Sequence, residues 1–117
     1  INSYKQIEKI INLNNKNKLI IIYIKDYLIK SFGIEWLSAL IRLINKNYSQ
    51  YNIKFFVDAG NDYGLAILIM RERIKYLKLR SNKTIIKKIY QIAKKNKVLL
   101  NPNFDIVNVS KIKKYEN

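Results

Sequence analysis

Short runs of apolar residues alternate along the chain with longer segments in which an apolar residue recurs every three or four positions. The run at 19–24 is unbroken and rich in β-branched residues, which is typical of a strand buried on both faces. Similar runs predict three further strands, at 53–57, 74–79 and 98–100. The three-to-four-residue periodicity predicts four helices, at 3–13, 32–47, 63–73 and 83–96.

Helices and strands therefore alternate along the sequence, which is the pattern of an α/β protein. Strands joined by helices of about ten to sixteen residues imply right-handed crossovers and a mainly parallel sheet. We expect a single α/β domain over 1–117, a small three-layer sandwich with a mainly parallel sheet of four or five strands. The candidate for the fifth strand is 104–109, and a basic tail follows at about 110–117.

The composition removes most of the side chains on which enzymes depend. The 117 residues contain no Cys and no His, so there is no disulfide, no thiolate ligand, no cysteine nucleophile and no histidine base. Gly60 and Gly64 follow a strand, but the dinucleotide fingerprint and the phosphate-loop motif are both absent. The sequence therefore predicts a protein that is not an enzyme and that binds no cofactor.

The charge balance is strongly basic, with 23 Lys and Arg against 8 Asp and Glu and a net charge of +15. Ile, Lys and Asn fill 56 of the 117 positions, and Lys outnumbers Arg 19 to 4, as in a gene from an AT-rich genome. Base drift explains the excess of Lys over Arg. It explains the low number of acids less well, because Asp and Glu codons are also fairly AT-rich. A polyanionic partner is the simplest cause.

The basic residues concentrate at 71–97, where eleven cations and the single acid Glu72 give a net charge of +10. On the expected helix, Lys83, Lys87 and Lys94 fall along one stripe, opposite the isoleucines. A solvated helix usually interleaves Glu with Lys, yet 83–97 contains no acid. A row of cations binds a phosphate backbone, although a merely solvated face is the alternative. The predicted RNA-binding residues are Arg71, Arg73, Lys78, Arg80, Lys83, Lys87, Lys88, Lys94, Lys95, Lys111, Lys113 and Lys114.

Aromatic side chains are a second means of holding RNA, because bases stack on them. Tyr4, Tyr23 and Tyr90 fall within apolar patterns, so we expect them in the core. The candidates for exposed tyrosines are Tyr48, Tyr51, Tyr63 and Tyr115.

Three of the eight acids lie in loops that leave the carboxyl ends of predicted strands, where open parallel sheets bind ligands. Four such loops are expected to meet there, at 25–31, 58–64, 80–83 and 101–103. One interpretation is an acidic pocket for a divalent metal or a phosphoryl group, built from Asp26 and Asp58 and similar to receiver-type phosphoacceptor domains. The acidic pair after the first strand of such domains is missing, however. The other interpretation, which we prefer, is that Asp58 and Asp62 accept bonds from turn and helix-start N–H groups.

The stretch at 56–66, together with Arg71 and the strand at 74–79, resembles short uncharacterised α/β proteins of alphaproteobacteria. The resemblance covers about residues 19–100 and implies mitochondrial or endosymbiont descent, with no known activity. A non-catalytic subunit of a large ribonucleoprotein fits these features best, in particular an organellar ribosomal protein that binds rRNA beside neighbouring subunits. The alternatives are an accessory subunit of a respiratory or ATP synthase assembly, and a regulatory domain similar in layout to anti-sigma antagonists, with Ser81 or Thr84 as its switch.

No stretch of about eighteen uncharged apolar residues is present, so we expect a soluble chain without a membrane span. No secretory signal is evident. The sequence begins with Ile1, which fits a processed chain or a non-AUG start of the kind that organellar genes use. The expected location is the mitochondrial matrix, and the alternative is the cytoplasm of an AT-rich bacterium.

Overall fold

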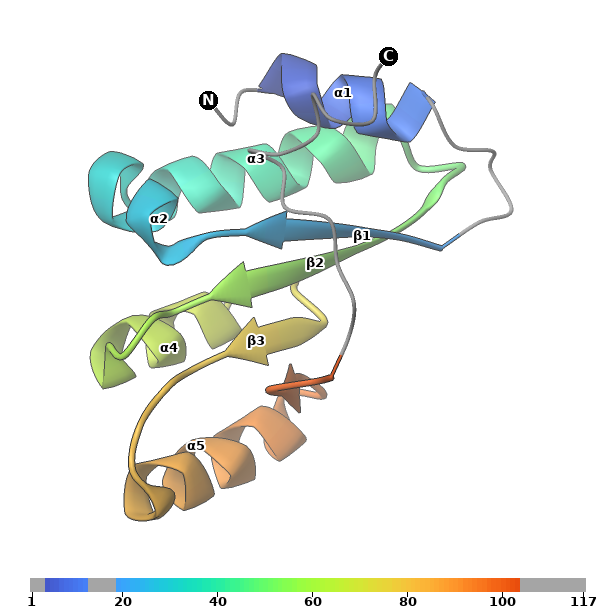
Figure 1. Cartoon of the computed structure of the whole chain (residues 1–117). Helices are drawn as coiled ribbons and strands as arrows, with labels where there is room; N and C mark the ends of the chain where they lie inside the picture. Colours follow the sequence, from blue (N-terminus) through green and yellow to red (C-terminus); the bar gives the residue numbers. More distant parts are fainter. Residues whose placement is uncertain (1–3, 13–18, 104–117) are drawn as a thin grey trace.

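The sheet is parallel and has four strands in the order β1-β2-β3-β4 (Figure 1). The computed structural model describes residues 4–12 and 19–103. Its strands are β1 (Leu19–Ile24), β2 (Asn52–Asp58), β3 (Tyr76–Lys78) and β4 (Leu99–Leu100). Its helices are α1 (Tyr4–Asn12), α2 (Asp26–Phe32), α3 (Ile34–Asn47), α4 (Tyr63–Met70) and α5 (Lys83–Lys95). The predicted α/β class and the parallel four-stranded sheet are confirmed.

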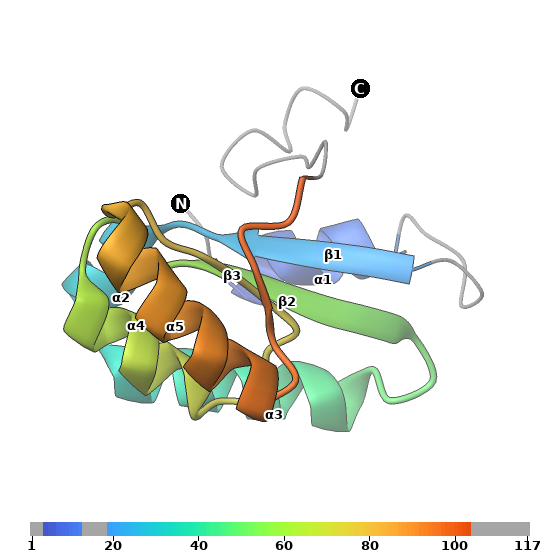
Figure 2. The ribbon, with the colours of Figure 1, turned by 90° about the horizontal axis from the view of Figure 1, so that it is seen from below.

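The strands follow one another across the sheet in chain order, and this order decides where the helices lie. A right-handed crossover between neighbouring parallel strands places its helix on the same face each time. Accordingly, α3, α4 and α5 all lie on one face of the sheet (Figure 2). We expected three layers, with helices on both faces of the sheet. The described residues form two layers, the sheet and one layer of helices, because the strands follow one another across the sheet in chain order.

The two faces of the sheet carry different side chains. The main core joins the face with Ile22 and Phe55 to the helices, where Leu37 and Ile44 of α3 are completely buried. The opposite face holds a small aromatic cluster of Tyr23, Phe56 and Tyr76. In that cluster the rings of Tyr23 and Phe56 meet edge to face, with their centroids 5.1 Å apart.

The predicted helix 32–47 corresponds to α3, which begins at Ile34, and a further helix, α2, covers most of the predicted loop at 25–31. Gly33 separates the two helices and has a φ of 90°, a conformation that glycine adopts readily and other residues avoid. The helix α2 was not predicted, although its Leu28 and Ile29 are buried in the main core.

The remaining elements begin and end within a few residues of the predicted positions, except that α4 ends at Met70 and β3 is only three residues long. The predicted fifth strand at 104–109 and the basic tail lie outside the described residues. Within the described residues, no helix combines the length and the apolar character needed to cross a lipid bilayer.

Candidate functional site

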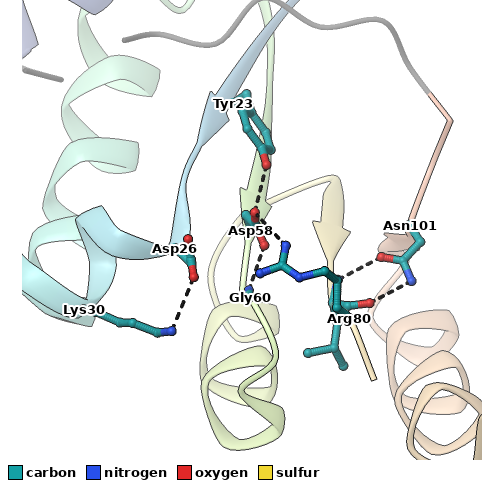
Figure 3. A network of polar contacts seen from close by, with 8 residues as sticks. Tyr23, Asp26, Lys30, Asp58, Gly60, Arg80 and Asn101 are labelled. Carbon is teal, nitrogen blue, oxygen red and sulfur yellow. Dashed lines mark hydrogen bonds and ion pairs between the residues drawn. The ribbon is translucent and has the colours of Figure 1, made fainter. Parts of the chain in front are cut away.

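The four segments that were predicted to meet at the carboxyl edge of the sheet do meet, and Asp58 is at their centre (Figure 3). The first of them, 25–31, is not a loop, because it forms most of α2. Asp58 is the last residue of β2 and is only 4% exposed. One carboxylate oxygen, Oδ2, accepts a 2.8 Å hydrogen bond from the Tyr23 hydroxyl, and the other, Oδ1, accepts a 2.7 Å bond from the backbone N–H of Gly60. Arg80 approaches from the next strand, with its Nη1 3.8 Å from Oδ2.

Tyr23 is held as a neutral hydrogen-bond donor. Burial, and then its hydrogen bond to the Asp58 carboxylate, raise the pKa of Tyr23 above the ordinary tyrosine value. Its hydroxyl therefore stays protonated at physiological pH and donates to the carboxylate, while the side chain of Arg80 is 59% exposed. The Arg80 guanidinium is therefore exposed to solvent beside Asp58, whose position is fixed by its hydrogen bond from Tyr23.

Gly60 brings the second acidic loop into contact with the first. Its φ is 65°, and a Cβ atom placed on it would lie 2.5 Å from Oδ2 of Asp26. Asp26 also forms a 3.3 Å ion pair with Lys30, one helical turn further along α2. The acidic loops are therefore packed against each other without space for a larger residue at this glycine.

The preferred interpretation of the acids is confirmed for Asp58 and Asp62. Asp58 accepts the turn N–H of Gly60, and Asp62 caps α4 by accepting a 3.0 Å bond from the N–H of Leu65. Among the described residues, no group of three His, Cys, Asp or Glu side chains is placed to hold a metal ion. Both oxygens of Asp58 accept hydrogen bonds within the protein, from Tyr23 and from Gly60.

Asn101 fastens the exit of β4 to the exit of β3. Its side-chain oxygen accepts a 2.8 Å bond from the N–H of Leu79, and its side-chain nitrogen donates a 3.0 Å bond to the carbonyl of the same residue. The φ of Asn101 is 48°, in the left-handed region that asparagine tolerates better than most residues. Beside this pair lies a hollow of about 460 Å³ lined by Tyr23, Phe56, Lys78, Leu79, Arg80, Asn101, Pro102 and Asn103.

A second hollow, of about 620 Å³, lies between α5 and β4 and shares Asn101 with the first. Asn82 caps α5 by accepting a 2.9 Å bond from the N–H of Ile85, so the helix begins as the sequence predicted. Tyr90 lies in this hollow and is 51% exposed, which corrects the expectation that it belongs to the core. The hollow is lined by Ser81, Lys83, Ile86, Lys87, Tyr90, Leu100 and Asn101.

The predicted basic residues divide between the two ends of the sheet. Lys78 and Arg80 lie at the carboxyl edge, next to the start of α5. Five lysines of α5 are exposed, as predicted: Lys83, Lys87, Lys88, Lys94 and Lys95. Arg71 and Arg73 precede β3 and so lie at its other end, away from Arg80. The predicted tail residues Lys111, Lys113 and Lys114 lie outside the described residues.

Arg71 and Arg73 have neighbours that the sequence analysis did not include. They line a hollow of about 690 Å³ together with Arg42 and Lys46 of α3. The spacing of Arg42 and Lys46 puts both on one side of a helix, and this is a readable signal. Nothing local in the sequence indicates that this side of α3 faces residues 71–73.

Comparison of the chain with protein-family models, with curated proteins and with solved structures found no match. The functional argument therefore depends on the chemistry of these surfaces.

Proposed function

We propose that this chain is a non-catalytic, basic subunit of a large ribonucleoprotein and that it binds structured RNA through the backbone phosphates. The observation that carries the proposal is the outer face of α5. It exposes five lysines, and no acid occurs anywhere from residue 83 to residue 97. Within the described part of the chain, none of these five lysines forms a salt bridge. Cations that the protein itself leaves unneutralised are available to phosphates.

The spacing along α5 suits an extended polyanion. At 1.5 Å of rise per residue, Lys87 lies about 6 Å and Lys94 about 16 Å along the axis from Lys83. All three are exposed and lie along one stripe that points away from the buried Ile89. A phosphate backbone laid along this face would meet several cations in succession and would release its counterions.

The start of α5 extends this cationic face onto the carboxyl edge of the sheet. Lys83 and Lys87 line the hollow that contains Tyr90, and Lys78 and Arg80 line the neighbouring one. An exposed tyrosine between lysines offers a stacking surface to an unpaired base without selecting its sequence. The surface is thus suited to RNA that is recognised by its shape and its backbone.

We further propose that the assembly is an organellar ribosome, with rRNA and neighbouring ribosomal subunits as partners and the mitochondrial matrix as the location. The amino-acid composition, rich in Ile, Lys and Asn as in proteins of AT-rich genomes, supports this finer assignment. The cytoplasm of an AT-rich bacterium is the alternative location, and the chemistry of binding is the same there.

The test is a comparison of two double variants that lose the same charge. Lys87→Gln with Lys94→Gln neutralises the middle and the end of the α5 face, whereas Lys5→Gln with Lys54→Gln neutralises exposed lysines on α1 and β2. The α5 variant should bind a structured RNA roughly 10- to 30-fold more weakly, since a contact between unit charges in water contributes about 1 kcal/mol. The control variant should bind nearly as well as the unaltered protein.

Urea denaturation of both variants should show unchanged midpoints, because all four lysines are exposed. Equal losses in the two variants would mean that net charge alone attracts RNA. Unchanged affinity in the α5 variant would show that this face is not the interface.

A further inference from the structure

Three of the four arginines of the chain line one hollow at the amino edge of the sheet. Arg42 comes from α3, Arg71 follows the last residue of α4, and Arg73 lies in the connection to β3. Lys46 adds a fourth cation to the same hollow, which has a volume of about 690 Å³. We call this surface the arginine groove, and its lining residues are Ser38, Ile41, Arg42, Asn45, Lys46, Arg71, Glu72 and Arg73.

The composition of the chain makes this gathering informative. Lys outnumbers Arg 19 to 4, so arginine is the rare cation of this chain, as in proteins of AT-rich genomes. Drift accounts for a surface covered with lysine, but it does not account for three arginines from separate elements at one place. A guanidinium differs from an ammonium in its planar fork of donors, which binds a phosphate through two parallel hydrogen bonds.

The groove is built by a contact between segments that are 34 residues apart. The Ser38 hydroxyl on α3 donates a short hydrogen bond to the Glu72 carboxylate. The backbone N–H of Glu72 donates a 2.9 Å bond to the carbonyl of Ile69, which fixes the residue at the end of α4. These two bonds hold the connection of residues 71–73 against α3, with an arginine on each side of the engaged acid.

The cations of the groove are not neutralised by the described part of the chain. Glu72 is the single acid that lines the arginine groove, so the four cations leave the groove with a net charge of +3. Among the described residues, none of Arg42, Lys46, Arg71 and Arg73 forms a salt bridge within 4.0 Å. The dipoles of α3 and α4 favour cations near their carboxyl ends, which accounts for Lys46 and Arg71. A dipole does not require arginine, and Arg73 lies beyond the helix.

We propose that the arginine groove binds phosphodiester groups of RNA through its guanidinium groups, as a second contact beyond the α5 face. This inference rests on the proposed function, because it takes the ligand to be the same RNA. The helix α5 runs from the carboxyl edge of the sheet at Lys83 toward the amino edge at Lys95. The arginine groove lies at that same amino edge, before β3. The last lysines of α5 and the arginine groove therefore lie at the same edge of the sheet.

The test uses the side-chain Nε–Hε signals of the four arginines in a two-dimensional NMR titration. An RNA hairpin should shift the signals of Arg42, Arg71 and Arg73 together and in a saturable way. The signal of Arg80, which lies at the carboxyl edge beside the start of α5, reports separately on the surface of the proposed function. A triple variant with Arg42→Lys, Arg71→Lys and Arg73→Lys keeps the positive charges but loses the paired N–H donors of the guanidinium groups. It should bind the hairpin roughly tenfold more weakly. The control variant Lys5→Gln with Lys54→Gln, which alters exposed lysines on α1 and β2, should bind with little change.

Two further titrations test whether the phosphate groups that bind the groove belong to RNA, to a lipid or to free phosphate. Inorganic phosphate and vesicles of an anionic phospholipid are titrated against the same four signals. Saturation by vesicles or by inorganic phosphate without any shift by the hairpin would overturn the assignment to RNA. Equal RNA affinity of the triple Lys variant and the unaltered protein would show that charge, and not guanidinium geometry, is what matters.

The two proposals fail separately. If the Lys87→Gln, Lys94→Gln variant loses RNA affinity while the three groove signals stay fixed, the arginine groove is not an RNA contact and the α5 face remains one. If the three signals saturate with the hairpin while the α5 variant binds normally, the groove is the contact and the α5 assignment fails.

Discussion

Replacing Tyr23 by Phe removes one oxygen atom from the carboxyl edge and tests how the buried Asp58 is held. In the structure, the Tyr23 hydroxyl donates a 2.8 Å bond to a carboxylate that is only 4% exposed. The variant keeps the ring, and therefore its edge-to-face contact with Phe56. It leaves Asp58 with the N–H of Gly60 and the more distant Arg80 guanidinium.

The expected loss in the free energy of unfolding is about 1.5–3 kcal/mol at neutral pH, the usual contribution of a hydrogen bond to a charged group. For a chain of 117 residues this corresponds to a fall in Tm of roughly 5–15 °C. Tyr63→Phe is the matched control, because Tyr63 is 40% exposed and its variant should differ by less than about 0.5 kcal/mol.

The effect should also depend on pH in a known direction. The unfolded chain ionises this tyrosine near pH 10, whereas burial and the Asp58 bond raise the pKa of Tyr23 in the folded protein. Above about pH 10 the folded protein therefore binds more protons than the unfolded chain, and stability falls by up to about 1.4 kcal/mol per pH unit. Below that pH the contribution is fully present. The stability difference between the protein and Tyr23→Phe should shrink above pH 10.

Urea denaturation followed by circular dichroism, repeated from pH 7 to pH 11, measures both effects. A Tyr23→Phe loss no larger than that of Tyr63→Phe would refute the argument that Asp58 depends on this donor. A difference between protein and variant that stays constant above pH 10 would refute the linkage.

Two further changes test the same edge of the sheet. Gly60→Ala should lower the free energy of unfolding, measured by urea denaturation, by about 1–3 kcal/mol. The reason is that the φ of this residue is 65° and that the added Cβ would lie 2.5 Å from Asp26. An unchanged free energy of unfolding would contradict this packing. Asn101→Ala should speed hydrogen exchange at the Leu79 amide, because that N–H loses its 2.8 Å acceptor, and unchanged exchange would mean that the side-chain pair does not hold β4 in place.

Much of the fold is predictable because its elements have strong local periodicity. The apolar run at 19–24 coincides with β1, and the acid-free pattern at 83–96 coincides with α5 to within one residue. The helix α2 was missed because it has only seven residues, too few for a helical periodicity to stand out in the sequence. The number of layers was missed for another reason: it depends on the order of strands in the sheet, and that order is not encoded in any local pattern.

The candidate sites show the same limit. The meeting of the four carboxyl-edge loops follows from the geometry of a parallel sheet, so it was predictable before the contacts of Asp58 were known. The arginine groove was not, because Arg42 reaches Arg71 and Arg73 through the packing of α3 against the end of α4. The Ser38–Glu72 bond that fixes this packing joins residues 34 positions apart.

The salt dependence of RNA binding is the most direct test of the claim that the lysines of α5 neutralise phosphates. If about four phosphates are neutralised, the logarithm of the association constant should fall against the logarithm of salt concentration with a slope of about −3. Lys87→Gln with Lys94→Gln should make that slope shallower by about 1.5 to 2. A slope near zero for the unaltered protein, or the same slope in the variant, would contradict the claim.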